Sequence, residues 1–240
     1  MAGNGMTRPD CEIISFASQD AMAARIADLI AAQLQLGQYQ NLMAEIAVSG
    51  GTTPRALYEN LACRALEWEK IRVTLVDERW VGIDSPRSNE AAIRKAFAKA
   101  TGVTIAGLYN NAETPQAGLV GCAAMFADRR QPFDVVVLGM GEDGHTASWF
   151  PHAEGLSDAI ESDALICAIR AIKSDITGEE VDRMTLTLSA IRDAKMIVLL
   201  VTGQTKRTVL ERALQPGPID DMPVRAVFHA RPDLWLCWAP

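Results

Sequence analysis

The 240-residue chain has few of the features that define several large classes of protein. Its five cysteines are an odd number, lie far apart and include no C-x-x-C pair, which argues against a disulfide framework and a structural zinc site. No apolar run is long enough to cross a bilayer, and residues 1–10 lack the apolar core of a signal peptide. Basic residues are outnumbered, with 23 lysines and arginines against 30 acidic residues and a net charge of -7. We therefore expect a cytoplasmic protein that binds neither nucleic acid nor a membrane.

The composition is that of an ordinary globular protein, with 49% hydrophobic and 22% charged residues, and strand-like and helix-like stretches alternate along it. The expected strands are 12–16, 45–48, 71–76, 133–138, 165–169, 184–188, 196–201, 225–228 and 234–238. The expected helices are 18–36, 54–66, 88–100, 115–129 and 205–214. This order predicts an α/β fold with a mostly parallel, twisted sheet and helices on both faces, Rossmann-like and doubly wound. The polar loop 173–182 is too short to separate two units, so residues 1–240 are expected to form a single α/β domain.

The most informative segment is 134–151, in which an apolar strand runs into a glycine-rich turn. The turn places Glu142, Asp143 and His145 at the carboxyl end of the strand, where α/β sheets bind their ligands. His145 is one of only three histidines, and imidazole is suited to proton transfer near neutral pH. Asp143 is positioned to hold one tautomer of the imidazole, which leaves the other nitrogen to activate water. The segment therefore predicts a catalytic loop.

The same turn contains a second pattern, because residues 139–144 spell the dinucleotide-binding motif G-x-G-x-x-G. That motif requires a following helix to carry the pyrophosphate, and Pro151 arrives seven residues later. The motif also belongs in the first βα turn of a binding half, whereas here it lies past the midpoint of the chain. We therefore expect no nicotinamide or flavin cofactor. No metal is expected either, since no additional ligands are suitably spaced around His145.

A phosphate-binding loop is predicted where the strand 45–48 ends in the sequence S-G-G-T-T-P. Gly50 and Gly51 let the backbone approach a ligand closely, and Thr52 and Thr53 add hydroxyl donors. Thr53 is expected to cap the next helix, whose free backbone N–H groups would face an anion. A plain capped βα turn remains an alternative reading. The Walker A pattern is absent, so a nucleoside triphosphate is not implied.

Cations are expected at the same sheet edge. Lys206 follows the strand 196–201 in the first turn of a helix, where the helix dipole disfavours a cation unless an anionic ligand is present. Arg183 begins the strand 184–188 and is a candidate second phosphate ligand, although alone it resembles any surface arginine.

Three charged residues, Asp77, Glu78 and Arg79, follow the strand 71–76. Asp77 and Arg79 are expected to face the substrate, and a structural ion pair between them is the alternative. Ser88 and Asn89 open the next helix, where Ser88 has the properties of a capping residue.

Together these segments resemble the glucosamine/galactosamine-6-phosphate isomerase–6-phosphogluconolactonase family. Four motifs carry the resemblance between about residues 49 and 227: S-G-G-T-T-P; D-E-R-W-V followed by S-N; L-G-M-G-E-D-G-H-T-A-S-W-F-P; and R-M-T-L-T-L with V-T-G-Q-T-K. The isomerase–deaminase branch places a glutamate just before the last proline of the third motif, where this chain has Phe150. The resemblance therefore favours the lactonase branch. Two departures are the sequence 171–176 in place of a P-K-P-P stretch, and Gly82 in place of a proline.

The resemblance implies hydrolysis of 6-phospho-D-glucono-1,5-lactone to 6-phospho-D-gluconate in the oxidative pentose phosphate pathway, without metal or cofactor. It implies catalytic roles for His145, Asp143 and Arg79. The implied substrate-binding residues are Gly50, Gly51, Thr52, Thr53, Asp77, Arg183 and Lys206. The expected partner is a small sugar-phosphate lactone, and the expected assembly is a monomer or weak homo-oligomer. A glucosamine-6-phosphate deaminase or isomerase is the main alternative, and a non-catalytic sugar-phosphate sensor is another.

Overall fold

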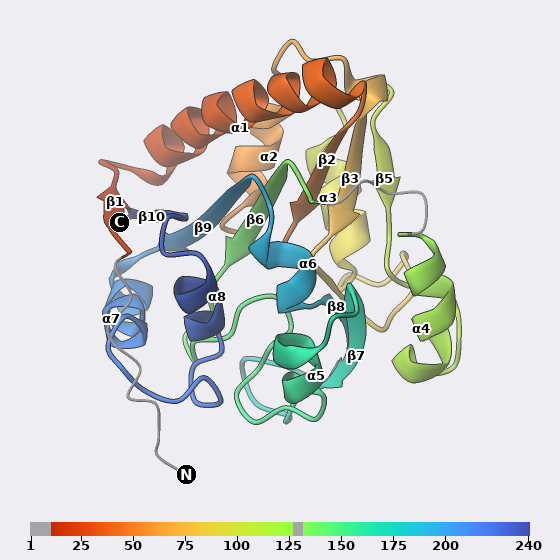
Figure 1. Ribbon diagram of the computed structural model, residues 1–240, viewed down its shortest axis with the longest axis vertical. Coiled ribbons are helices and arrows are strands. Elements are labelled where there is room, and N and C mark those ends of the chain that lie inside the picture. The colour runs from red at the N-terminus through yellow and green to blue at the C-terminus, as the bar shows by residue number, and fades with distance from the viewer. Residues whose placement is uncertain (1–10, 127–131) are drawn as a thin grey trace.

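The computed structural model describes residues 11–126 and 132–240, and in these ranges the strands form two sheets (Figure 1). The larger sheet contains β1 (Ile13–Ser15), β2 (Ala44–Val48), β3 (Ile71–Leu75), β5 (Thr104–Ala106), β6 (Val135–Gly139), β9 (Met196–Thr202) and β10 (Trp235–Ala239). Its order is β1-β10-β9-β6-β2-β3-β5, and every neighbouring pair is parallel. The smaller sheet is antiparallel, with β4 (Asp77–Arg79), β8 (Asp182–Leu186) and β7 (Ile166–Arg170) in that order.

Helices cover both faces of the larger sheet, which confirms the predicted fold class. They are α1 (Gln19–Asn41), α2 (Arg55–Leu61), α3 (Asn89–Ala96), α4 (Pro115–Ala124), α5 (Leu156–Glu161), α6 (Leu188–Arg192), α7 (Gln204–Ala213) and α8 (Val224–Ala230), with a short 3-10 helix at Trp68–Lys70. Figure 1 shows α1 along one side of the strands and α6 and α8 along the other. The central strands are apolar and buried, as expected for a parallel sheet covered on both faces. In the described ranges no helix combines the length and apolarity needed to span a membrane.

One expected element is wrong. The segment 225–228, predicted as a strand, lies in the buried helix α8. A short apolar run reads equally well as a buried strand or a buried helix, and periodicity cannot separate them. The small elements β4, β5, α5 and α6 were not predicted, because three to six residues carry little periodic signal. Residues 127–129 of the expected helix 115–129 lie outside the described residues.

The topology places a crevice at the carboxyl ends of two central strands. The chain proceeds from β2 to β3 in one direction, and β6 then pairs with the opposite side of β2. Such a reversal of strand order opens a crevice where α/β proteins bind ligands. The predicted phosphate loop follows β2, and the predicted catalytic loop follows β6. Two segments that are about ninety residues apart in sequence therefore meet at one edge.

Candidate active site

A cavity of about 340 Å³ lies at this edge. Nine of the ten predicted site residues line it: Gly50, Gly51, Thr52, Thr53, Asp77, Arg79, His145, Arg183 and Lys206. The tenth, Asp143, does not line the cavity but lies within hydrogen-bonding distance of the His145 ring. The sequence did not single out Ser49 or Ile176, which also border the cavity.

The histidine of the catalytic loop is held by the carboxylate two residues earlier. His145 Nδ1 lies 2.6 Å from Asp143 Oδ1, and the same oxygen accepts the His145 backbone N–H at 3.1 Å. Gly141 donates its N–H to the His145 carbonyl at 2.9 Å and closes the turn. A Cβ at Gly141 would overlap the imidazole, so only glycine fits beneath the ring.

The charge of Asp143 selects the imidazole tautomer. Burial tends to raise the pKa of Asp143, but the hydrogen bond and the charge of His145 outweigh it and hold the pKa below its ordinary value. The carboxylate is therefore ionised at neutral pH and accepts a proton from Nδ1. Nε2 then carries the lone pair, which is the form required of a general base. The His145 side chain is 21% exposed, so water reaches the ring through the cavity.

Phe150 separates this histidine from a buried arginine. Its ring lies 4.3 Å from the His145 ring, centroid to centroid, while the Arg183 guanidinium lies 5.2 Å from the Phe150 centroid. Phe150 is buried and borders the cavity. A phenylalanine side chain carries no exchangeable proton. It therefore cannot transfer a proton to an amine or a ring oxygen, as a carboxylate at this position could.

The glycine loop is joined to a second strand end. Thr53 Oγ1 and Thr202 Oγ1 lie 3.1 Å apart and connect the loop after β2 to the end of β9. The prediction that Thr53 caps α2 is wrong: Pro54 occupies the cap position, without a side-chain hydrogen bond. Thr53 instead uses its hydroxyl in the contact to Thr202. Gly50 is packed so closely against Asn89 that a Cβ there would overlap the Asn89 amide oxygen.

Lys206 projects to the cavity from the first turn of α7, which begins after Gly203. It is half-buried, and within 11–126 and 132–240 its ammonium group has no ion-pair partner. Lys173, by contrast, is exposed, pairs with Glu179 at 2.7 Å and does not border the cavity. Lys206 is therefore the lysine available to an anionic ligand.

Asp77 and Arg79 are not paired with each other in the described part of the chain. Asp77 Oδ2 accepts a hydrogen bond from Ser148 Oγ at 2.6 Å, and Arg79 Nη1 donates to the Arg87 carbonyl at 2.5 Å. Arg79 Nε is buried and has no hydrogen-bond partner among the described residues. Both side chains are thus held in place and border the cavity, which leaves the alternative of a simple ion pair unsupported.

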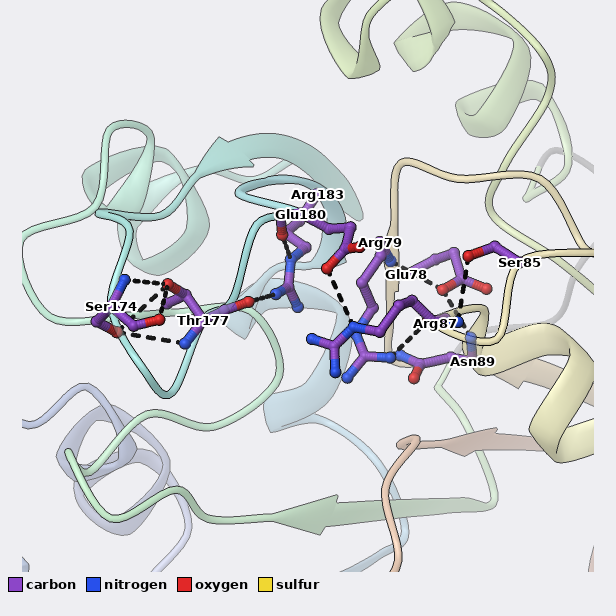
Figure 2. Close-up of polar contacts among 9 residues, drawn as sticks. All are labelled: Glu78, Arg79, Ser85, Arg87, Asn89, Ser174, Thr177, Glu180 and Arg183. Atoms are coloured by element: carbon purple, nitrogen blue, oxygen red, sulfur yellow. Dashed lines mark hydrogen bonds and ion pairs between the residues drawn. The ribbon is translucent and has the colours of Figure 1, made fainter.

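Glu78, between these two residues, is a positioning group that sequence reasoning missed. Its fully buried carboxylate accepts the backbone N–H groups of Arg79, Asn89 and Glu90, each at 2.8 Å. It thereby joins β4 to the beginning of α3. Figure 2 draws Glu78 with Arg79 and Asn89. Burial raises the pKa of Glu78 above its ordinary value, although these donors oppose the shift. The sequence did contain a signal for Glu78, because it is the middle residue of three charged residues that follow an apolar strand.

Arg183 is buried, and part of its hydrogen-bonding capacity is already used. Nε donates to the Glu180 carbonyl at 2.6 Å and Nη2 donates to the Thr177 carbonyl at 2.9 Å. Burial lowers its pKa to about 10; Asp77 opposes this shift and Arg79 adds to it. Arg79 and Arg183 are cross-strand partners between β4 and β8. Two neighbouring guanidinium groups therefore make this wall positive in a protein whose net charge is -7.

The fold and the cavity define an α/β protein with an anion-attracting pocket beside a histidine–carboxylate pair. The family model described as glucosamine-6-phosphate isomerases/6-phosphogluconolactonase matches residues 17–238, and the chain belongs to this family.

Individual relatives refine the comparison. The chain is 38% identical over 228 residues to a 6-phosphogluconolactonase of Rhizobium meliloti, covering 94% of this chain and 97% of the relative. It is similar to the crystal structure of a 6-phosphogluconolactonase from Shewanella baltica, with a TM-score of 0.92 and 34% identity over 98% of this chain and 100% of that one. A monomeric glucosamine-6-phosphate deaminase matches at 17% identity and a TM-score of 0.76, covering 95% of each chain. That likeness shows the fold alone, so the deaminase alternative has to be judged at the site.

Proposed function

We propose that the chain hydrolyses 6-phospho-D-glucono-1,5-lactone to 6-phospho-D-gluconate, the second step of the oxidative pentose phosphate pathway. The observation that carries the proposal is the combination, around one cavity, of an imidazole held by Asp143, two arginines, and Lys206, which has no ion-pair partner among the described residues. The names of the curated relatives and of the Shewanella structure support the same activity. Phe150, where a glutamate is expected in the isomerase–deaminase branch, speaks against the alternative.

His145 is the general base of the proposed mechanism. Its Nε2 takes a proton from water, and the oxygen of that water forms a bond to C1 of the lactone. The carbonyl electron pair moves onto oxygen, and Arg79 stabilises this developing oxyanion. Collapse of the intermediate breaks the bond between C1 and the ring oxygen, which receives the proton from the imidazolium. Asp143 keeps Nδ1 protonated throughout and stabilises the transient positive charge.

The remaining residues bind the sugar phosphate. Lys206 and Arg183 provide positive charge for the phosphate, and the loop Gly50–Thr53 provides backbone and hydroxyl donors. Asp77 accepts hydrogen bonds from sugar hydroxyl groups through the oxygen that Ser148 leaves open. Binding energy gained at the phosphate places C1 beside His145.

The decisive experiment follows acid release from freshly generated lactone, corrected for spontaneous hydrolysis. Glucosamine 6-phosphate serves as the comparison substrate, with ammonia release as the readout. Acid release well above the spontaneous rate, without ammonia release, is the expected result. Ammonia release without lactone hydrolysis would establish the deaminase, and binding of 6-phosphogluconate with neither activity would establish the sensor.

We also propose that the protein acts in the cytoplasm as one α/β domain, either as a monomer or as a weak homo-oligomer. Scattered free cysteines suit a reducing compartment. The buried apolar residues of both sheets and their covering helices form one hydrophobic cluster, which favours one folding unit. Cell fractionation and sedimentation at several protein concentrations test these points.

A further inference from the structure

Each of the two cavity arginines donates a hydrogen bond to a backbone carbonyl of a neighbouring loop. Arg79 Nη1 donates to the Arg87 carbonyl at 2.5 Å, and Arg183 Nε donates to the Glu180 carbonyl at 2.6 Å. Arg87 lies in the β4–α3 loop (residues 80–88), and Glu180 lies in the β7–β8 loop (residues 171–181). Neither residue borders the cavity itself.

The side chains of these two tethering residues pair with each other. Arg87 Nε donates to Glu180 Oε2 at 3.0 Å, and Figure 2 shows the pair between the two loops. Arg87 also packs over Gly178, where a Cβ would lie 3.2 Å from its Nη2. The result is a continuous chain of contacts, Arg79 to Arg87 to Glu180 to Arg183. The ion pair holds together the two loops that orient both cavity arginines.

The position of the β7–β8 loop affects the cavity directly. Ser174 and Thr177 exchange short-range hydrogen bonds, and Thr177 Oγ1 donates to the Ile172 carbonyl at 2.9 Å. These bonds shape the tip of the loop, and the bond from Arg183 Nη2 to the Thr177 carbonyl at 2.9 Å joins the tip to β8. Ile176, at this tip, borders the cavity, so a shift of the loop changes both the arginine and the cavity wall.

We propose that Arg87 and Glu180 form a clasp, a pair of positioning residues that fixes the spacing of Arg79 and Arg183 around an anionic substrate. This inference rests on the proposed function for its substrate, but the anion-binding geometry does not depend on lactone chemistry. The clasp acts through the loops and touches no reacting atom. Its loss shifts Arg183, which binds the phosphate, and Arg79, which stabilises the oxyanion, so KM should rise and kcat should fall slightly.

The test compares Arg87→Gln, Glu180→Gln and the charge swap Arg87→Glu/Glu180→Arg with the wild-type protein. Each single variant should raise KM for the lactone about threefold to fivefold, the range of a partly exposed ion pair, and lower kcat by no more than about twofold. The dissociation constant of inorganic phosphate should rise by the same factor. The charge swap should recover most of the loss, since it restores the pair in the opposite sense.

The matched control is Arg170→Gln. Arg170 pairs with Asp182 at 2.9 Å on the same small sheet, carries the same charge and does not border the cavity. It should leave KM and phosphate binding unchanged. Equal effects of Arg170→Gln and Arg87→Gln, unchanged constants in both single variants, or a swap no better than the worse single variant would each overturn the clasp.

The two proposals fail in distinguishable ways. A wild-type protein that binds phosphate but does not hydrolyse the lactone contradicts the proposed function, and the phosphate series still decides the clasp. A wild-type protein that binds no phosphate overturns the clasp together with the anion pocket.

Discussion

The reacting centre and the anion-binding rim of the cavity are built in different ways. The centre consists of Asp143, His145 and Phe150, which lie within eight consecutive residues, and both Asp143 and Phe150 contact His145. The rim is assembled from the glycine loop after β2, Arg183 on β8 and Lys206 on α7, which are far apart in sequence. The centre is thus one local turn in which each residue depends on the next, whereas the rim is a set of separate contributions. Changes to the centre should lower kcat, and changes to the rim should raise KM in increments.

The largest effect is expected from His145→Ala, which removes the base. We expect kcat to fall by about 10²-fold or more, because positioned proton transfer contributes that much. Binding of 6-phosphogluconate should persist, since the rim is untouched, and calorimetry can measure it. His152→Ala is the matched control, because His152 is 61% exposed and pairs with Asp221 instead. Near-normal hydrolysis by His145→Ala would remove the base assignment and the distinction between centre and rim.

Asp143→Asn should lower kcat on the order of tenfold to 10²-fold, because an amide no longer fixes the protonated Nδ1 or stabilises imidazolium. The free energy of unfolding of the variant should also depend less on pH than that of the wild-type protein. The folded pKa of Asp143 lies below its unfolded value, so its contribution is present above the unfolded pKa and disappears as pH falls through the folded pKa. The free energy of unfolding, measured in urea at about pH 7 and about pH 3, should therefore differ less between the two pH values for the variant than for wild type. An identical difference in both proteins would show that Asp143 is not held ionised by His145.

Gly141→Ala tests the centre without removing any functional group. The added methyl would overlap the imidazole, so the ring must move away from the position that Asp143 sets. We expect kcat to fall about tenfold, since displacing a catalytic group by about 1 Å costs that much or more. Gly139→Ala is the control, because its methyl would meet only Ser49 Oγ at 4.0 Å. Equal kcat and KM values for the two variants would mean that the turn can accommodate the methyl group without displacing the His145 ring.

The same contrast explains what the sequence could and could not predict. The centre was predictable because strand, glycines, carboxylate and histidine follow each other in one segment. Lys206 was predictable as an anion-binding residue, because it lies in the first turn of a helix, where a cation without an anionic ligand is disfavoured. The larger sheet was predictable because strand-like and helix-like stretches alternate along the sequence, and its buried strands are short apolar runs.

What the sequence did not reveal depends on contacts over long distances. The small sheet that pairs Arg79 with Arg183 joins segments about a hundred residues apart, and a three-residue strand carries no periodic signal. Thr53 was expected as a helix cap because the local pattern favours it, and its contact with Thr202 could not be read locally. The segment 225–228 of α8 was mistaken for a strand because all four of its residues are buried, which removes the helical period from the pattern.

Lys206→Ala is expected to have an effect no larger than that of Gly141→Ala and to act on KM alone. Lys206 is half-buried and unpaired in the described ranges, so its loss removes charge from the rim without leaving another charge unpartnered. A charge-assisted contact of this kind should change KM about tenfold, with kcat within about twofold. Raising the salt concentration should narrow the gap between variant and wild type, because ions screen the same attraction. Lys173→Ala, which removes an exposed lysine paired with Glu179, should change neither constant. A fall in kcat as large as the rise in KM would mean that Lys206 contacts the transition state as well, and the rim and the centre would then not be separable.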